Sequence, residues 1–368
     1  MSLIDLSKQV ALGIDIGGTN TKFGVVNHRG EVLEKGSLKT DEYEKVEDFI
    51  DALYEHVSPL IEKHGTEKNF DGIGVGAPNA NYYKGTIEQA PNLPWKGLIP
   101  FTDLMKAKFN LPCTITNDAN AAALGEMLFG AARGMKDFIM ITLGTGVGSG
   151  IISNGSLIYG HDGFAGELGH TIVKPGGRKH WSTGSEGSLE AYASATGIAI
   201  TAKKMRAEFP ESILNQYPEE AINSKTVHEC ALKEDPIAIE VFRYTGQKLG
   251  EALANFVMFS SPEAILLFGG VIKAGDFILK PAKLHMERNL LPIFRNKVKL
   301  VFSELDEADA AILGASALVW EKNRQNLFKI REAPDWVLFY LYQKSIKLLY
   351  HLWKFVGFVG TKFFIFIN

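Results

Sequence analysis

Two stretches of the chain repeat one local pattern, and this repeat limits the possible folds more than any other feature of the sequence. In both, an apolar run leads into a turn of glycine and threonine and then into a second such run, which predicts two strands joined tightly. The copies cover residues 10–26 and 138–152. Their turns contain Gly17, Gly18 and Thr19 in the first copy and Gly144, Thr145 and Gly146 in the second. We expect one copy in each of two domains that face each other.

Strands and helices alternate along the rest of the chain. Further strands are predicted at residues 32–38, 72–76, 114–116 and 264–268. Helices are predicted at residues 44–63, 190–210, 236–259 and 308–320, with an alanine-rich helix after residue 120. This order predicts an α/β fold with a mixed sheet. Chains of 368 residues usually form two or three domains.

The composition excludes several classes of protein. The chain has 39 Lys and Arg against 42 Asp and Glu, a net charge of −3, so it does not have the basic field that nucleic-acid binding needs. Cys113 and Cys230 are too few for a disulfide framework and do not have the spacing of a metal site. The amino terminus does not have the pattern of a signal peptide, so we expect a cytoplasmic protein.

The two glycine turns are candidate phosphate-binding sites. A glycine pair lets backbone N–H groups approach an anion closely, because no Cβ atom intervenes. Thr19 adds a hydroxyl, and Asp15, at the end of the preceding strand, could hold Mg²⁺ through water. Either turn alone could be an ordinary hairpin, but a facing pair would hold a polyphosphate from both sides. The turns are neither a Walker A loop nor a dinucleotide motif, because the Gly-Lys-Ser/Thr ending is missing and a strand follows.

Other residues are candidates for sugar binding and catalysis, and each has a structural alternative. Asp118, between a strand and a helix, could be a general base or could cap the helix. Asn117 beside it could bind neighbouring hydroxyls. Three further residues could contact a polyol or could be ordinary surface-loop residues: Glu167, His170 and Glu190. A close backbone approach to adenine, or a structural turn, would explain Gly269 and Gly270.

Seven motifs occur in order along the chain: DIGGTNTKFGVV, GAP, APNLPW, NDANAA, LGTGVGSG, GELGH and LFGGV. With them, residues 10–320 resemble the ROK family of sugar kinases, in particular its bacterial glucokinases. The resemblance implies an actin-like ATPase (ribonuclease H-like) fold, in which two α/β domains enclose a ligand cleft. The implied domains are residues 10–123, completed by a helix near 308–322, and residues 124–307. ATP, Mg²⁺, a sugar and a second copy of the chain are the implied ligands and partner.

The resemblance also implies roles for individual residues. The family's phosphate loops correspond to the two glycine turns, its adenosine motif to Gly269 and Gly270, and its catalytic base to Asp118. Its sugar contacts correspond to Asn92, Asn117, Asp118, Glu167, His170 and Glu190.

One motif departs from the family pattern. ROK kinases usually bind zinc through the histidine of the GELGH motif and three cysteines of a following segment. In residues 176–190 those cysteines are missing, and Ser188 stands where the last one would be. His170, His180 and Glu186 are conceivable substitutes, but the soft thiolates of a structural zinc site are absent. We therefore expect no zinc, and a loop ordered by the packing of Trp181 and by turns at its glycines.

The leading interpretation is ATP-dependent phosphorylation of a hexose, with glucose O6 as acceptor and Asp118 as base. Mannose, fructose and N-acetylglucosamine stay open, because the candidate side chains contact hydroxyls that these sugars share, and so does polyphosphate as donor. Some ROK proteins are instead sugar-responsive repressors with a winged-helix domain before the first phosphate motif. About a dozen residues precede that motif here, so catalysis is the stronger expectation.

Residues 323–368 form a tail of different composition. Residues 336–368 hold 22 apolar positions, and no Asp or Glu follows Asp335. Basic residues at helical spacing beside aromatic ones are typical of a helix lying on an anionic membrane, which predicts weak membrane contact through residues 336–356. We favour the alternatives taken together: packing on the body of the protein, an oligomer contact, or no selected role.

Overall fold

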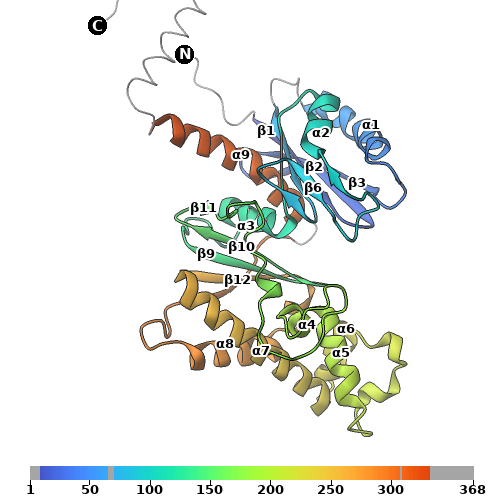
Figure 1. Cartoon of the computed structure of the whole chain (residues 1–368), viewed down its shortest axis with the longest axis vertical. Helices are drawn as coiled ribbons and strands as arrows, with labels where there is room; N and C mark the ends of the chain where they lie inside the picture. The colour runs from blue at the N-terminus through green and yellow to red at the C-terminus, as the bar shows by residue number, and fades with distance from the viewer. Residues whose placement is uncertain (1–8, 65–69, 307–308, 332–368) are drawn as a thin grey trace, which may run out of the picture. The chain divides into compact units, whose positions relative to one another are not determined.

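The computed structural model describes residues 9–64, 70–306 and 309–331, with side chains up to residue 321. Contacts divide the chain into a compact unit that ends at Val319 and a second unit from Trp320 onward. The first unit contains the two sheets on which the rest of the description rests (Figure 1). The membrane-contact prediction for residues 336–356 lies outside the described residues, and the domain boundary near residue 123 stays a prediction.

The first sheet has five strands in the order β3-β2-β1-β4-β8. Strand β1 pairs antiparallel with β2 and parallel with β4, and β4 pairs parallel with β8. The carboxyl ends of β1, β4 and β8 therefore lie at one edge. Their bounds are β1 (Val10–Ile16), β2 (Asn20–Asn27), β3 (Val32–Lys39), β4 (Phe70–Gly76) and β8 (Cys113–Thr116).

The second sheet repeats the first. Its order is β11-β10-β9-β12-β13, again an antiparallel pair of strands joined to two parallel strands. This repetition confirms the two copies of one supersecondary unit that the sequence predicted. The bounds are β9 (Phe138–Leu143), β10 (Val147–Ser153), β11 (Ser156–Leu157), β12 (Ala264–Phe268) and β13 (Lys299–Phe302). A small third sheet, which was not predicted, contains β5 (Ala80–Asn81), β6 (Thr86–Glu88) and β7 (Leu98–Ile99).

Nine α-helices lie among the described residues. They are α1 (Val46–His64), α2 (Phe101–Phe109), α3 (Asp118–Phe129), α4 (Glu190–Ala193), α5 (Ala195–Arg206), α6 (Ser224–Leu232), α7 (Pro236–Ser260), α8 (Asp276–Asn289) and α9 (Ala310–Arg331). The helix predicted at residues 190–210 is interrupted at Ser194, whose extended backbone ends α4 and whose side chain accepts a hydrogen bond from Gly197 N to begin α5. Helix α9 continues eleven residues beyond the predicted end at Trp320.

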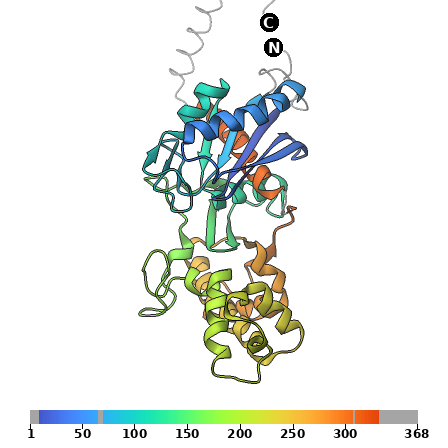
Figure 2. The ribbon, with the colours of Figure 1, turned by 90° about the vertical axis from the view of Figure 1, so that its right-hand side faces the viewer.

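Helices cover both faces of the first sheet (Figures 1 and 2). Leu12 and Ile14 of β1 lie in the same buried apolar cluster as Phe49 of α1. The residue between them, Gly13, points to the other face, where a Cβ atom would lie only 2.2 Å from Ile312 O of α9. Because side chains alternate across a strand, glycine at such positions lets α9 approach the sheet closely.

The same close approach at Gly74 of β4 gives a test of this packing. A Cβ atom there would lie 1.9 Å from Ala315 O, a backbone atom that can give way only if α9 moves. We expect Gly74→Ala to lower the free energy of unfolding by about 3 kcal/mol, measured by urea denaturation. Ser37→Thr adds one methyl group on the exposed face of β3 and should change it by less than about 0.5 kcal/mol. Equal effects of the two variants would contradict the packing described.

Candidate functional site

Three parallel strands bring two aspartates to one edge of the first sheet. Asp15 at the end of β1 pairs in register with Gly76 of β4, and Gly76 pairs with Thr116 of β8. Asp118 follows Thr116 by two residues and begins α3. A Cβ atom on Gly76 would lie 3.6 Å from both Asp15 Oδ1 and Asp118 Cα. Position 76 therefore borders both aspartates.

Both carboxyl groups are poorly hydrated, and the charge of Asp118 acts on Asp15. Burial raises the pKa of Asp15 from 3.8 to about 6, and the charge of Asp118 adds to the rise while Lys22 opposes it. Asp118 can be reached by solvent, yet the protein around it displaces enough water to raise the pKa of its carboxyl group as well. Hydrogen bonds from the backbone amides of Ala119 and of Asp118 itself oppose this second rise. A group that is accessible but poorly solvated suits proton transfer.

Asp118 does not cap the helix, which was the alternative for it. The cap of α3 is Asn117, whose Oδ1 accepts a hydrogen bond of 3.0 Å from Asn120 N. Asp118 is the first helical residue, and its Oδ1 accepts from Ala119 N at 2.8 Å. The side-chain oxygen of Asn117 is thus partly committed to the helix, while the NH₂ group of the same side chain stays a candidate for hydroxyl contacts.

The first glycine turn lies against the segment that carries Asn92. Gly17 N donates to Asn20 O at 3.0 Å and closes the turn. A Cβ atom on Gly18 would lie 2.6 Å from Asn92 O, so only glycine permits this approach. Thr19 and Asn92 are both exposed. The structure therefore brings together one candidate phosphate turn and one candidate sugar contact.

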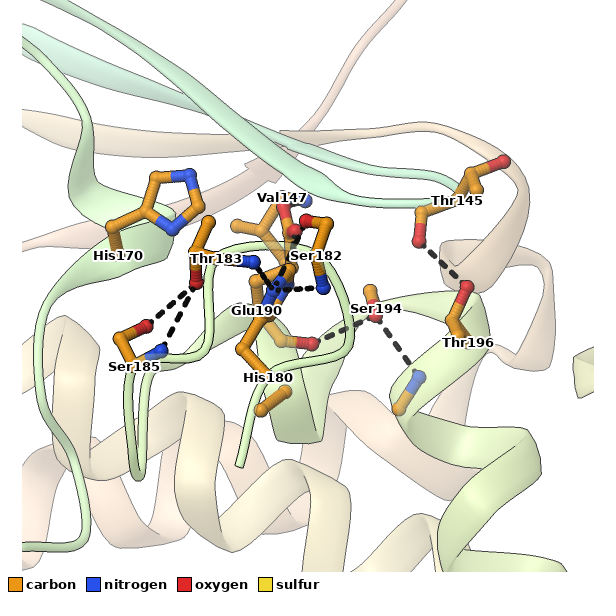
Figure 3. Close-up of polar contacts among 12 residues, drawn as sticks. Thr145, Val147, His170, His180, Ser182, Thr183, Ser185, Glu190, Ser194 and Thr196 are labelled. Atoms are coloured by element: carbon orange, nitrogen blue, oxygen red, sulfur yellow. Dashed lines mark hydrogen bonds and ion pairs between the residues drawn. The ribbon is translucent and has the colours of Figure 1, made fainter. Parts of the chain in front are cut away.

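The second glycine turn is packed against a carboxylate (Figure 3). Gly144 N donates to Gly146 O at 3.0 Å, and Thr196 Oγ1 donates to Thr145 O at 3.0 Å. Val147 N, directly after the turn, donates to Glu190 Oε2 at 2.7 Å. Glu190 is thus tied to the backbone of the candidate phosphate turn as well as being a candidate sugar contact.

Glu167 and His170 lie in the electrostatic range of the same carboxylates. Burial raises the pKa of Glu167, the nearby His170 lowers it, and the charges of Asp118 and Glu190 raise it further. Glu167 Oε2 lies 4.0 Å from His170 Nε2, and both residues are exposed. Four predicted site residues are therefore neighbours, although they come from separate parts of the sequence.

A pocket of about 650 Å³ extends from the second turn to the strand-ending glycines. Gly144, Thr145 and Gly270, three of the residues predicted to bind the nucleotide, line it. Gly269 has a structural role in the motif: its φ is +106°, and a Cβ atom there would lie 2.5 Å from Leu143 O, so the turn requires glycine. The sequence interpretation missed four polar residues that also line the pocket: Ser224, Lys225, His228 and Lys273. Three of them lie on α6 and one follows Gly270, so they are far apart in the sequence and only the structure shows that they line one pocket.

The loop that lacks the family's cysteines is held by two side chains other than the predicted one. The Arg178 guanidinium donates to Ala191 O at 2.6 Å and to Gly197 O at 2.9 Å. His180 is buried, and its Nε2 lies 2.6 Å from Glu190 Oε1. Trp181, predicted to order the loop by packing, is 45% exposed and stacks on the His180 ring at 4.1 Å. The predicted glycine turns are present, with φ of +81° at Gly187.

The contacts of His180 do not fit a zinc ligand. His180 Nε2 contacts Glu190, and its Nδ1 accepts from Ser182 N and Thr183 N at 3.2 Å each, so neither ring nitrogen has a free lone pair. In the part of the chain that the structure describes, no three His, Cys, Asp or Glu residues form a group that could hold a metal. Among the same residues, no helix is long and apolar enough to cross a membrane.

Comparisons with known proteins agree with the geometry. The ROK family profile matches residues 11–322. A glucokinase of Halalkalibacterium halodurans is 37% identical, over 87% of this chain and 97% of its own length. The structure of a ROK family glucokinase from Streptomyces griseus in complex with glucose and AMPPNP is 33% identical, with a TM-score of 0.69 over 84% of this chain and 98% of that one. A xylose repressor of Caldicellulosiruptor bescii is 30% identical, over 86% of this chain and 80% of its own length.

This chain has two like sheets, each with a glycine-turn hairpin, and its backbone matches that of the ROK family glucokinase structure. The chain therefore has the actin-like ATPase fold, and it belongs to the ROK family.

Proposed function

We propose that the protein is an ATP-dependent hexose kinase that transfers a phosphoryl group to O6 of glucose. The observation that carries the proposal is the environment of Asp118. Its side chain is accessible to solvent, burial by the surrounding protein raises its pKa, and Asn117 caps the helix in its place. The glucokinase relatives support the reaction class and the choice of glucose.

Asp118 is the proposed general base. The 6-hydroxyl of the sugar gives its proton to the Asp118 carboxylate as the oxygen attacks the γ-phosphorus. A carboxyl group with a raised pKa holds a proton more firmly at neutral pH than an ordinary aspartate does, which suits a base in such a transfer. The Ala119 amide, which donates to Oδ1, holds the carboxylate in one orientation.

Backbone amides and a cation would hold the nucleotide. The proposed phosphate contacts are the turns Gly17, Gly18, Thr19 and Gly144, Thr145, Gly146, with Gly269 and Gly270 toward the adenosine. Asp15 fits Mg²⁺ held through water, because its desolvated carboxylate lies in the field of a second carboxylate, Asp118, which Lys22 opposes. When bound, Mg²⁺ supplies charge neutralisation on the transferring phosphate.

The proposed sugar contacts are Asn92, Asn117, Glu167, His170 and Glu190. Carboxylates and amides of this kind bind hydroxyl pairs that glucose shares with mannose, fructose and N-acetylglucosamine, so they favour no single hexose. A homodimer, a cytoplasmic location and the absence of nucleic acid among the partners stay predictions from the sequence. The alternative function is a sugar-sensing regulator, because a xylose repressor is also a relative.

A panel of hexoses, each assayed with ATP and with polyphosphate as donor, tests the reaction. Formation of the phosphorylated sugar is measured with both donors, and release of ADP is measured with ATP. We expect the highest kcat/KM with glucose and ATP. Sugar binding by calorimetry without phosphorylation of any hexose would favour the regulator. A higher kcat/KM for another hexose, or for polyphosphate, would replace the substrate named here.

Asp118→Asn tests the base. The amide keeps the shape of the side chain but cannot take a proton, so we expect kcat to fall by about 10²–10⁴-fold while glucose binding, measured by calorimetry, persists. Asp51→Asn, on the exposed face of α1, is the matched control and should leave kcat unchanged. Turnover near that of the wild type in Asp118→Asn would remove Asp118 as the base.

Asp15→Asn tests whether the pKa of Asp15 is raised in the folded protein, in the absence of Mg²⁺. Because the pKa of Asp15 rises from 3.8 to about 6 on folding, the folded protein keeps a proton that the unfolded chain has lost, and the free energy of unfolding falls as pH rises through that window. Asp15→Asn should remove the fall and be more stable than the wild type at pH 7 by roughly 2–3 kcal/mol. Urea denaturation in EDTA at pH 4 and pH 7 measures it. The same difference between variant and wild type at both pH values would contradict the shift.

A further inference from the structure

Both oxygens of the Glu190 carboxylate are held by different parts of the chain (Figure 3). Oε2 accepts from Val147 N at 2.7 Å, directly after the second glycine turn. Oε1 lies 2.6 Å from Nε2 of His180, in the loop before α4. The side chain of Glu190 is 14% exposed and that of His180 1%. One carboxylate thus joins a candidate phosphate turn to a buried histidine.

The contacts of His180 fix which of its nitrogens carries the proton. The backbone amides of Ser182 and Thr183 both point at Nδ1, at 3.2 Å each, so Nδ1 must be the acceptor. The proton is then on Nε2, which donates to Glu190 Oε1. The two loop amides therefore orient the ring so that its single N–H group faces the carboxylate.

Glu190 lies close to a second carboxylate and to the glycine turn. The charge of Glu190 raises the pKa of Glu167, which shows that the two carboxylates oppose each other. The carboxylate is also packed tightly against the turn: a Cβ atom on Gly146 would lie 2.5 Å from Glu190 Oε2. Without a fixed donor at Oε1, the side chain could rotate away from Glu167 and leave the Val147 amide.

We propose that His180 is a positioning residue, which holds the Glu190 carboxylate against the turn at Gly144–Gly146 on one side and near Glu167 and His170 on the other. The ring of His180 lies 5.8 Å from that of His170, edge to face, so the same side chain also borders the sugar-facing residues. The inference rests on the proposed function for its catalytic consequence, but not for its geometry. Hydrogen bonds thus do in this loop what a metal ion would otherwise do.

The loop has a second anchor, so a His180 variant should still fold. Arg178 donates to Ala191 O, Gly197 O and Thr201 Oγ1 and stacks over Tyr192, all independently of His180. Loss of His180 should therefore release Glu190 and not the whole loop.

Four variants of the full chain separate the hydrogen bond from mere packing. His180→Ala removes the donor, and His180→Gln keeps an N–H group that can reach Glu190. Trp181→Ala removes the ring stacked on His180 but none of its hydrogen bonds, and His56→Gln changes an exposed histidine on α1. For each variant, hydrogen–deuterium exchange of the segment that contains Val147 is measured, together with kcat and the KM values for sugar and ATP.

We expect His180→Ala to speed exchange at Val147 by about tenfold, the effect of losing one charge-assisted hydrogen bond. The KM values for sugar and ATP should both rise by roughly tenfold, with a smaller change in kcat, because Glu190 contacts both ligand sites but not the reacting atoms. His180→Gln should restore most of both effects. Trp181→Ala and His56→Gln should leave the exchange at Val147 unchanged.

Several results would overturn the proposal. Unchanged exchange at Val147 in His180→Ala would mean that Glu190 is held without His180, and an effect of Trp181→Ala as large as that of His180→Ala would assign the role to packing. Long-range ¹H–¹⁵N spectra that show the Nδ1–H form of His180, or elemental analysis that finds about one zinc per chain, would contradict the hydrogen-bond pattern. If no sugar is phosphorylated, the proposed function fails, but the exchange and the spectra still test the anchor.

Discussion

The in-register ends of β1, β4 and β8 are the constraint on which the rest of the candidate site depends. Parallel pairing aligns Asp15, Gly76 and Thr116 in one row, so the chain that leaves β8 delivers Asp118 next to Asp15. Gly76, at the centre of the row, borders both residues. Backbone pairing thus places two like charges in a poorly hydrated space, which is an unfavourable arrangement unless a proton or a cation compensates it.

The sequence predicted those features that local patterns determine. The repeated hairpins, the mixed sheet and the strand-to-helix position of Asp118 follow from residues close together in the chain. Features that depend on distant contacts were not predicted. Lys225 and His228 lie on α6, which packs on α5 and α7, and they join Gly144 in one pocket although about eighty residues separate them in the chain. Trp181 was expected to pack because it is large and apolar, but Arg178 and His180 form the hydrogen bonds that order the loop, which local hydrophobicity does not indicate.

The small break at Ser194 shows the same limit at a helix. An apolar pattern through residues 190–210 predicts one helix, and the structure has two. The extended backbone of Ser194 begins α5 with a side-chain cap, and it lets Ala195 N donate to Gly144 O at 2.8 Å. A long uninterrupted helix would not present that amide to the second glycine turn. The local cost of the break is therefore offset by a backbone contact with the candidate phosphate site.

Two acidic residues of the site, Glu190 and Asp15, have different surroundings, and the difference separates the residues that position ligands from those that take part in the chemistry. Glu190 has a donor at each oxygen, the Val147 amide at one and His180 at the other, so its position is set. The surroundings of Asp15 differ: burial and the charge of Asp118 raise its pKa, while Lys22 lowers it. A carboxylate in a poorly hydrated field of like charge binds a proton or a cation readily. We interpret the Glu190 end of the site as the part that orients ligands and the Asp15 and Asp118 end as the part where cation and proton are handled.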